Sequence, residues 1–105
     1  MKKAIKQDYV GMVLDELNRA ELKFPSFPID PLHAAAILAE EVGELQRACL
    51  EWIYEGGCFE VIKKEAVQSA AMALRFLFNM EHFKRRPSDQ RKRAPGSTQL
   101  FFDLE

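Results

Sequence analysis

The chain has 105 residues, of which 48% are hydrophobic and 30% are charged, with a formal net charge of −1. This length is that of one domain, and the composition excludes a disordered chain. Residues 84–105 hold six basic and three acidic side chains, so the first 83 residues carry a net charge of −4. An acidic core argues against nucleic-acid binding by the core, because nucleic-acid-binding domains are typically basic.

No apolar run approaches the length of a membrane span, and the charged start of the chain has no apolar signal-peptide region. Cys49 and Cys58 are not spaced as a metal-binding pair, so we expect two reduced thiols. These features predict a cytoplasmic protein without a membrane partner. The abundance of Leu, Ala, Met, Glu and Lys favours helix throughout.

The first predicted helix covers residues 3–22. Its apolar positions recur at helical spacing and are Ile5, Tyr9, Met12, Val13, Leu17 and Ala20. Residues 24–31, FPSFPIDP, contain three prolines, and proline cannot continue a helix because it lacks the amide hydrogen.

The second predicted helix begins at Pro31, with Asp30 as its N-cap, and runs to about Tyr54. Gly56 and Gly57 follow and are typical of a helix end. One apolar seam is expected along this helix, made of Leu38, Val42, Leu45, Cys49 and Trp52.

The third predicted helix runs from about Phe59 to Arg85. Its apolar residues form two stripes on opposite sides, one of Val67, Ala70, Leu74, Leu77 and Phe78 and one of Val61, Met72, Phe76 and Phe83. A helix that is apolar on two sides is buried on both. We therefore predict an all-α protein, an antiparallel bundle of three long helices that is completed by oligomerisation as a homodimer or homotetramer.

The predicted helical core is residues 1–86, and residues 87–105 form a basic linker with an apolar tail. The terminal Gln99–Leu104 stretch, QLFFDL, resembles the short peptides that dock on bacterial sliding clamps. The alternative is that its apolar side chains pack back on the core or on a partner subunit.

Three carboxylates, those of Glu40, Glu41 and Glu44, lie among the apolar residues of the second helix. At about 100° per residue, Glu41 borders the apolar seam, Glu44 lies one turn further on, and Glu40 points nearer to solvent. On the third helix, Glu65 shares a stripe with apolar residues, which is costly for a carboxylate without a counter-charge. Gln68 follows Glu65 by three positions.

Two antiparallel helices would bring Glu41 and Glu44 opposite Glu65 and Gln68. Such hard oxygen ligands suit Mg²⁺ or Mn²⁺. The alternative is an ordinary solvated acidic face, which is the usual meaning of two glutamates three positions apart on a helix.

The stretches LAEEVGELQRA and KKEAVQSAAMALRFL resemble the all-α nucleotide pyrophosphatases, which include the MazG-like proteins, dimeric dUTPases and dCTP pyrophosphatases. The family pattern is E-E-x-x-E on one helix and E-x-x-D on the next. Glu40, Glu41 and Glu44 match the first part and Glu65 matches the second. The resemblance covers roughly residues 5–85.

The resemblance implies a Mg²⁺-dependent hydrolase that cleaves nucleoside triphosphates into a monophosphate and pyrophosphate, as in the house-cleaning of unwanted nucleotides. It implies catalytic roles for Glu40, Glu41, Glu44 and Glu65, and metal binding by the last three of these.

Gln68 departs from the family pattern, because it stands where the family has aspartate. Its amide oxygen can coordinate a metal, but it brings no charge. Either the chain works with E-x-x-Q, or catalysis is reduced or lost. The alternative function is therefore a non-catalytic metal- or nucleotide-binding protein, or an interaction protein whose QLFFDL tail docks on a partner.

Four further residues are candidates for binding substrate. Lys64 and Arg75 suit phosphates, Asn79 suits a base or sugar, and Trp52 suits stacking on a nucleobase. The alternatives are a solvated lysine for Lys64 and core packing for Trp52. If there is a general base, Glu40 or Glu44 is the better candidate than a histidine.

Overall fold

The computed structural model describes residues 8–85, and the regular elements in that part of the chain are all helices, with no strand. Its elements are α1 (Tyr9–Lys23), α2 (Pro31–Tyr54), α3 (Phe59–Phe78) and the short 3₁₀ helix η2 (Met80–His82). The predicted all-α class is confirmed. Residues 1–7 and 86–105, with the predicted linker and QLFFDL tail, lie outside the described residues.

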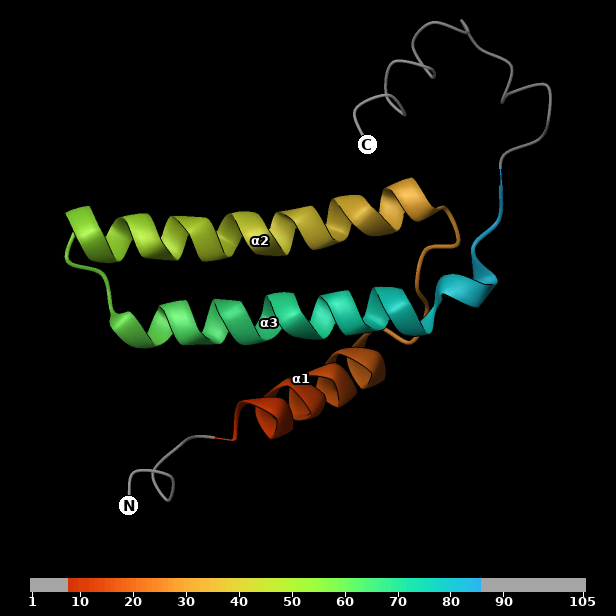
Figure 1. Ribbon diagram of the computed structural model, residues 1–105, viewed down its shortest axis with the longest axis horizontal. Coiled ribbons are helices and arrows are strands. Elements are labelled where there is room, and N and C mark those ends of the chain that lie inside the picture. Colours follow the sequence, from red (N-terminus) through yellow and green to blue (C-terminus); the bar gives the residue numbers. More distant parts are fainter. Residues whose placement is uncertain (1–7, 86–105) are drawn as a thin grey trace, which may run out of the picture.

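The helix α3 is the central element. Figure 1 shows α2 antiparallel beside it and α1 against its other side. The helices α1 and α2 pack mainly on α3 rather than on each other. None of the helices in residues 8–85 is long and apolar enough to cross a membrane.

Side-chain caps explain where α1 and α2 begin. The Asp8 carboxylate accepts a hydrogen bond of 2.9 Å from the Gly11 amide, and α1 starts at Tyr9, directly after Asp8. The Asp30 carboxylate accepts one of 2.9 Å from the Leu32 amide, with Pro31 in the first turn of α2. The predicted start and cap of α2 are thus confirmed. Each cap gives a hydrogen-bond acceptor to an amide of the first turn, which has no acceptor within the helix.

The turn from α2 to α3 depends on a glycine. Glu55 and Gly57 both donate backbone hydrogen bonds to the Glu51 carbonyl, at 2.8 and 2.9 Å. Gly56 lies between them with a φ of 71°, a left-handed conformation that residues with a Cβ rarely adopt. This turn reverses the chain and sets α3 antiparallel to α2. Cys49 and Cys58, on either side of it, are not bridged.

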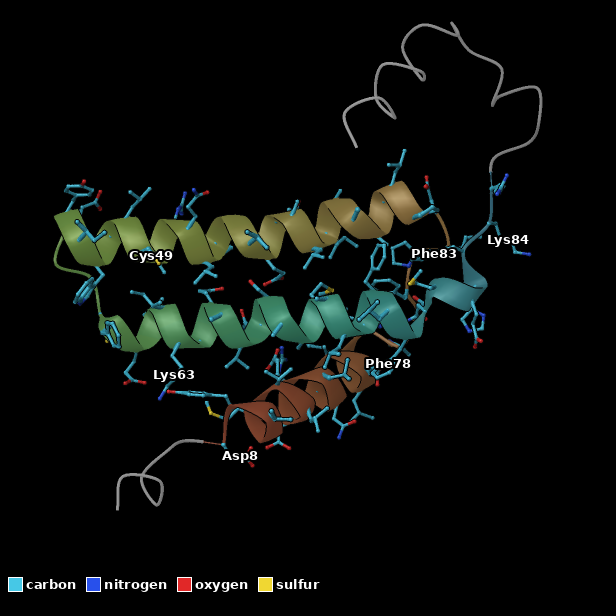
Figure 2. The ribbon with its side chains drawn as sticks, in the orientation of Figure 1. Asp8, Cys49, Lys63, Phe78, Phe83 and Lys84 are labelled. Atoms are coloured by element: carbon cyan, nitrogen blue, oxygen red, sulfur yellow. The ribbon has the colours of Figure 1, made fainter. Side chains whose placement is uncertain are left out.

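The helix α3 ends at Phe78, seven residues before the predicted end at Arg85. The Asn79 side chain donates a hydrogen bond of 2.8 Å to the Arg75 carbonyl, which ends the helix. The chain then turns back, and Figure 2 shows Phe83 beside the end of α3. The Phe83 ring packs edge-on against that of Phe76, with ring centroids 5.0 Å apart. The Lys84 amide bonds to the Ile29 carbonyl at 2.9 Å. Helical spacing alone does not reveal this return.

Arg75 fixes the connection between α1 and α2. Only 4% of Arg75 is exposed. Its guanidinium donates to the carbonyls of Phe24 and, at 3.2 Å, Ser26, and it lies over the Phe27 ring at 5.0 Å. These contacts attach the proline-rich segment 24–30 to α3. We call this set of contacts the Arg75 clasp.

Replacing Arg75 by alanine should destabilise the fold, because it leaves two carbonyls without their donor. We expect Arg75→Ala to cost about 2–4 kcal/mol and to lower Tm by roughly 10 °C or more, measured by thermal circular dichroism without ligands. The control is Arg47→Ala at an exposed position of α2, with an effect of at most about 0.5 kcal/mol. Equal melting of the two variants would contradict the role of the clasp.

Candidate functional site

Glu41 lies on the side of α2 that packs against α3. Ala34 and Ala48, seven residues before and after it, are buried. Val42 and Trp52, which the sequence places on the buried seam, are each 48% exposed. Leu38, Leu45 and Cys49, the other members of that seam, are partly buried. The buried face of α2 therefore keeps most of the predicted seam and extends to the side of Ala34 and Ala48, where Glu41 is itself partly buried.

The structure places Glu41 at the centre of a group of negative charges. Partial burial is the main cause that raises its pKa above the ordinary value of 4.5. The charges of Glu65, Glu44, Glu16 and Glu40 raise the pKa further, in that order. The carboxylates predicted on α2 and α3 thus act on one point, and Glu44 and Glu40 are the more exposed members.

The helix α1 contributes a carboxylate and a guanidinium that the sequence analysis missed. Glu16 accepts hydrogen bonds of 2.9 Å and 2.5 Å from Nε and Nη2 of Arg19. These hydrogen bonds are the main cause that lowers the pKa of Glu16, and burial works against them. The Lys64 charge also lowers the pKa of Glu16.

One sequence signal was available for Glu16. At about 100° per residue, it falls among Met12, Val13 and Ala20, inside the predicted apolar stripe of the first helix. This is the same costly placement that singled out Glu65 on the third helix. Glu16 of α1 and Glu65 of α3 therefore share one sequence signal, a carboxylate within an apolar stripe.

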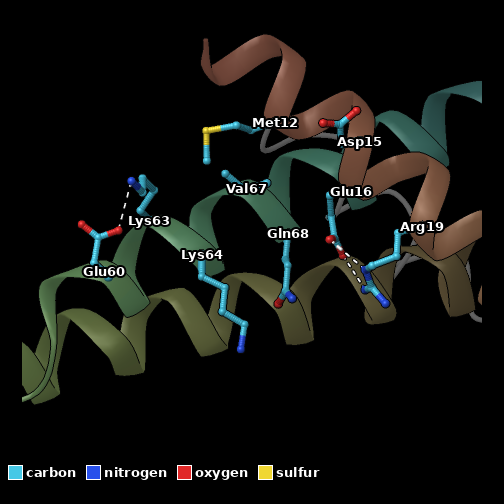
Figure 3. A pocket seen from close by; sticks show the side chains of 9 residues that line it. All are labelled: Met12, Asp15, Glu16, Arg19, Glu60, Lys63, Lys64, Val67 and Gln68. Atoms are coloured by element: carbon cyan, nitrogen blue, oxygen red, sulfur yellow. Dashed lines mark hydrogen bonds and ion pairs between the residues drawn. The ribbon is translucent and has the colours of Figure 1, made fainter. Parts of the chain in front are cut away.

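Gln68 and Lys64 line a hollow of about 690 Å³ between α1 and α3. Figure 3 shows both side chains pointing to the same side as the Glu16–Arg19 pair. Lys63, which also lines the hollow from α3, is paired with Glu60 at 3.0 Å. A smaller hollow of about 120 Å³ is lined by Gln68 together with Glu16, Arg19, Glu41 and Arg75.

The remaining predicted site residues lie apart from Glu41 or have other contacts. Trp52 is near the turn between α2 and α3, where its ring packs edge-on against Phe59 at 5.2 Å. Eleven residues of α2 separate it from Glu41, or about 16 Å along the helix. Asn79 caps α3, and Arg75 forms the clasp while it also lines the smaller hollow. Their predicted substrate contacts stay predictions.

The donor groups around Glu41 fit Mg²⁺ chemically, because all are hard oxygens and a cation would relieve their mutual repulsion. Within residues 8–85, no three acidic, histidine or cysteine side chains come close enough to enclose an ion. Like charges favour side-chain conformers that keep carboxylates apart, so enclosing a cation requires rotation of flexible Glu side chains.

Comparison of the chain with protein-family models, curated proteins and solved structures finds no match. The family resemblance read from the sequence therefore stays a prediction.

Because the pKa of Glu41 is raised, replacing Glu41 by a neutral residue should stabilise the fold in a pH-dependent way. A raised carboxyl pKa gives stability that is present below pH 4.5 and lost as pH rises through the raised value. Without divalent cations, Glu41→Gln should melt like the wild type near pH 4 and a few degrees higher than the wild type at about pH 7.

The control for this measurement is Glu55→Gln, which removes the same charge at the C-cap of α2, about 20 Å from Glu41 along the helix axis. Its melting temperature relative to the wild type should not show the same rise between the two pH values. A Glu41→Gln variant with no greater advantage at pH 7 than at pH 4 would contradict the burial of charge at Glu41.

Proposed function

We propose that this chain is a Mg²⁺-dependent nucleoside triphosphate pyrophosphohydrolase of the MazG-like kind, releasing a nucleoside monophosphate and pyrophosphate. The observation that carries the proposal is the position of Glu41. It is partly buried, and carboxylates from α2 and α3 that match the family pattern raise its pKa. A cation held among these carboxylates would relieve their mutual repulsion, and this favours a cation-binding centre over a solvated acidic face.

In this proposal, Glu41, Glu44, Glu65 and Gln68 hold the ion through oxygen atoms. Mg²⁺, or Mn²⁺ in its place, supplies neutralisation of the triphosphate charge and acidification of a bound water. The protein's own contribution is to hold the carboxylates between α2 and α3, where partial burial strengthens their electrostatic effect.

The other side chains act on the substrate and on the proton. Lys64 binds phosphate oxygens from the larger hollow and Arg75 binds them from the smaller one. Glu40 or Glu44, which are exposed at the edge of the group, accepts the proton of the attacking water.

Pyrophosphate release from a panel of ribo- and deoxyribonucleoside triphosphates with Mg²⁺ tests this function. We expect release from at least one nucleotide, and a loss of about 100-fold or more in Glu41→Gln and in Glu65→Gln. Glu55→Gln is the control of equal charge and should keep full activity. If no nucleotide yields pyrophosphate and Mg²⁺ does not stabilise the protein, the enzyme proposal fails.

A substitution at Gln68 should strengthen Mg²⁺ binding, whereas the preceding substitutions weaken function. Gln68→Asp restores the family's carboxylate and adds one negative charge beside Glu41. We expect Mg²⁺ affinity, measured by calorimetry, to rise about tenfold, which corresponds to about 1.4 kcal/mol. Gln68→Ala, which removes the oxygen, should bind more weakly than the wild type. Indifference of Mg²⁺ binding to both changes would exclude Gln68 from the ligands.

We also propose that a second copy of the chain covers an apolar groove between α1 and α3. We call it the α1–α3 groove; its walls are Tyr9, Val10, Val13, Leu14, Phe59, Ile62, Ala66, Val67, Ala70, Ala73 and Leu74. Several large members of this groove are exposed in the single chain. Apolar surface of this extent is typical of an interface between subunits.

Sedimentation of the full chain tests the second copy. We expect at least a dimer, and a shift toward monomer when a charge enters the groove in Val10→Glu. Leu32→Glu, at an exposed position at the start of α2 and outside the groove, is the control and should leave the assembly unchanged. A wild-type chain that sediments as a monomer would overturn this part of the proposal.

A further inference from the structure

The Glu16–Arg19 ion pair is less exposed on its Glu16 side than an ordinary surface ion pair. The pair has i, i+3 spacing, and exposed pairs of this kind contribute little to stability. However, the side chain of Glu16 is only 18% exposed, while that of Arg19 is 52% exposed. One partner is therefore held inside the helix junction, and the other reaches solvent.

Two hollows meet at this pair. Glu16, Arg19 and Gln68 line both the larger hollow, which also contains Lys64, and the smaller one, which also contains Glu41 and Arg75. The pair thus lies between the smaller hollow, which contains Glu41, and the part of the larger hollow that contains Lys64. Figure 3 shows Arg19 folded back onto Glu16, with Gln68 and Lys64 beside them.

A second observation points to an anionic ligand in the smaller hollow. Arg75 is 4% exposed and no ion pair to it is formed within residues 8–85. Its Nε is buried and donates no hydrogen bond in that part of the chain. A buried guanidinium without an anion is costly, and an anion in the hollow that it lines would reduce the cost.

The charges suggest how Arg19 responds to ligands. Glu16 is close enough to Glu41 for their charges to interact, and in the absence of a cation Arg19 offsets the Glu16 charge. A divalent cation at Glu41 would attract Glu16 and weaken its hold on Arg19. A released guanidinium can bind two phosphate oxygens at once, since its planar fork matches phosphate as well as carboxylate.

We propose that Arg19 is a phosphate-binding residue whose guanidinium exchanges Glu16 for the triphosphate of a nucleotide when a divalent cation is held at Glu41. This inference rests on the proposed function and adds α1 to the substrate-binding elements. Arg19 and Arg75 then approach the phosphates from the same small hollow, and Glu16 is the positioning residue that keeps Arg19 in place before the substrate enters.

Calorimetric binding of a non-hydrolysable nucleoside triphosphate analogue with Mg²⁺ tests the exchange without relying on turnover. The analogues carry the same bases and sugars as the nucleotides of the pyrophosphate panel. We expect Arg19→Gln to weaken analogue binding at least about tenfold, with Mg²⁺ binding in the absence of nucleotide at wild-type strength or stronger. Arg19→Lys should recover part of the loss, because an ammonium keeps the charge but not the fork.

The Glu16→Gln variant distinguishes the proposed exchange of Arg19 partners from a purely structural role of the Glu16–Arg19 pair. It should keep or raise affinity for the analogue, because Arg19 is no longer held, and it should weaken Mg²⁺ binding. Arg47→Gln on α2 is the control and should match the wild type in both titrations. If Arg19 is only structural, both Arg19→Gln and Glu16→Gln should lower Tm and weaken both ligands together.

The outcomes distinguish this inference from the proposed function. If the wild type releases pyrophosphate, Glu41→Gln does not, and Arg19→Gln binds the analogue within twofold of the wild type, only the inference is overturned. If the wild type neither releases pyrophosphate nor binds the analogue, the proposed function and the inference both fail. Selective loss of analogue affinity in Arg19→Gln, with Mg²⁺ binding intact, supports the exchange.

Discussion

The Arg75 clasp is the interaction on which the arrangement of the helices depends. The helices α1 and α2 pack mainly on α3, so their positions relative to each other depend on the segment that joins them. Arg75 attaches that segment to α3 through the carbonyls of Phe24 and Ser26. Because the segment follows directly on α1, the clasp also fixes where Glu16 and Arg19 lie along α3.

Each of the three helices contributes carboxylates whose charges interact at Glu41. Glu16 of α1 and Glu65 of α3 share stripes with apolar residues, which is costly for a charge, and both raise the pKa of Glu41. Proteins retain such costly charges mainly where the charge binds or transforms a ligand. The guanidinium of Arg19 offsets part of the repulsion in the chain without ligands.

Local signals allowed α2 to be predicted closely, because Asp30, Pro31 and Gly56 act within one turn of the helix ends. The end of α3 was not predicted, because helical spacing shows neither the cap that Asn79 makes on the Arg75 carbonyl nor the return of Phe83 to Phe76. The burial of α2 was misjudged at Val42 and Trp52, which are exposed. Side-chain size suggested a seam through Val42, whereas close approach of α3 favours Ala34 and Ala48.

The candidate site was predictable where the signal lay within one helix. The carboxylates of α2 and α3 follow a spacing that can be read directly, and Glu16 carried the same signal but was not recognised. The clasp role of Arg75 was beyond sequence reasoning, because its partners are carbonyls about 50 positions away that any residue type could supply. Which helix lies in the middle is likewise a property of the packed chain.

The small core has a calorimetric consequence. Within residues 8–85, the buried apolar residues are Leu17, Ala34, Ala48 and Ala71, and three of these four are alanines. The heat-capacity change of unfolding grows with the apolar area that becomes hydrated, so a single chain of this kind has a small change and a flat stability curve. Any association that hides the α1–α3 groove steepens that curve. Heat capacity therefore reports the apolar surface that the protein covers in solution, independently of its mass.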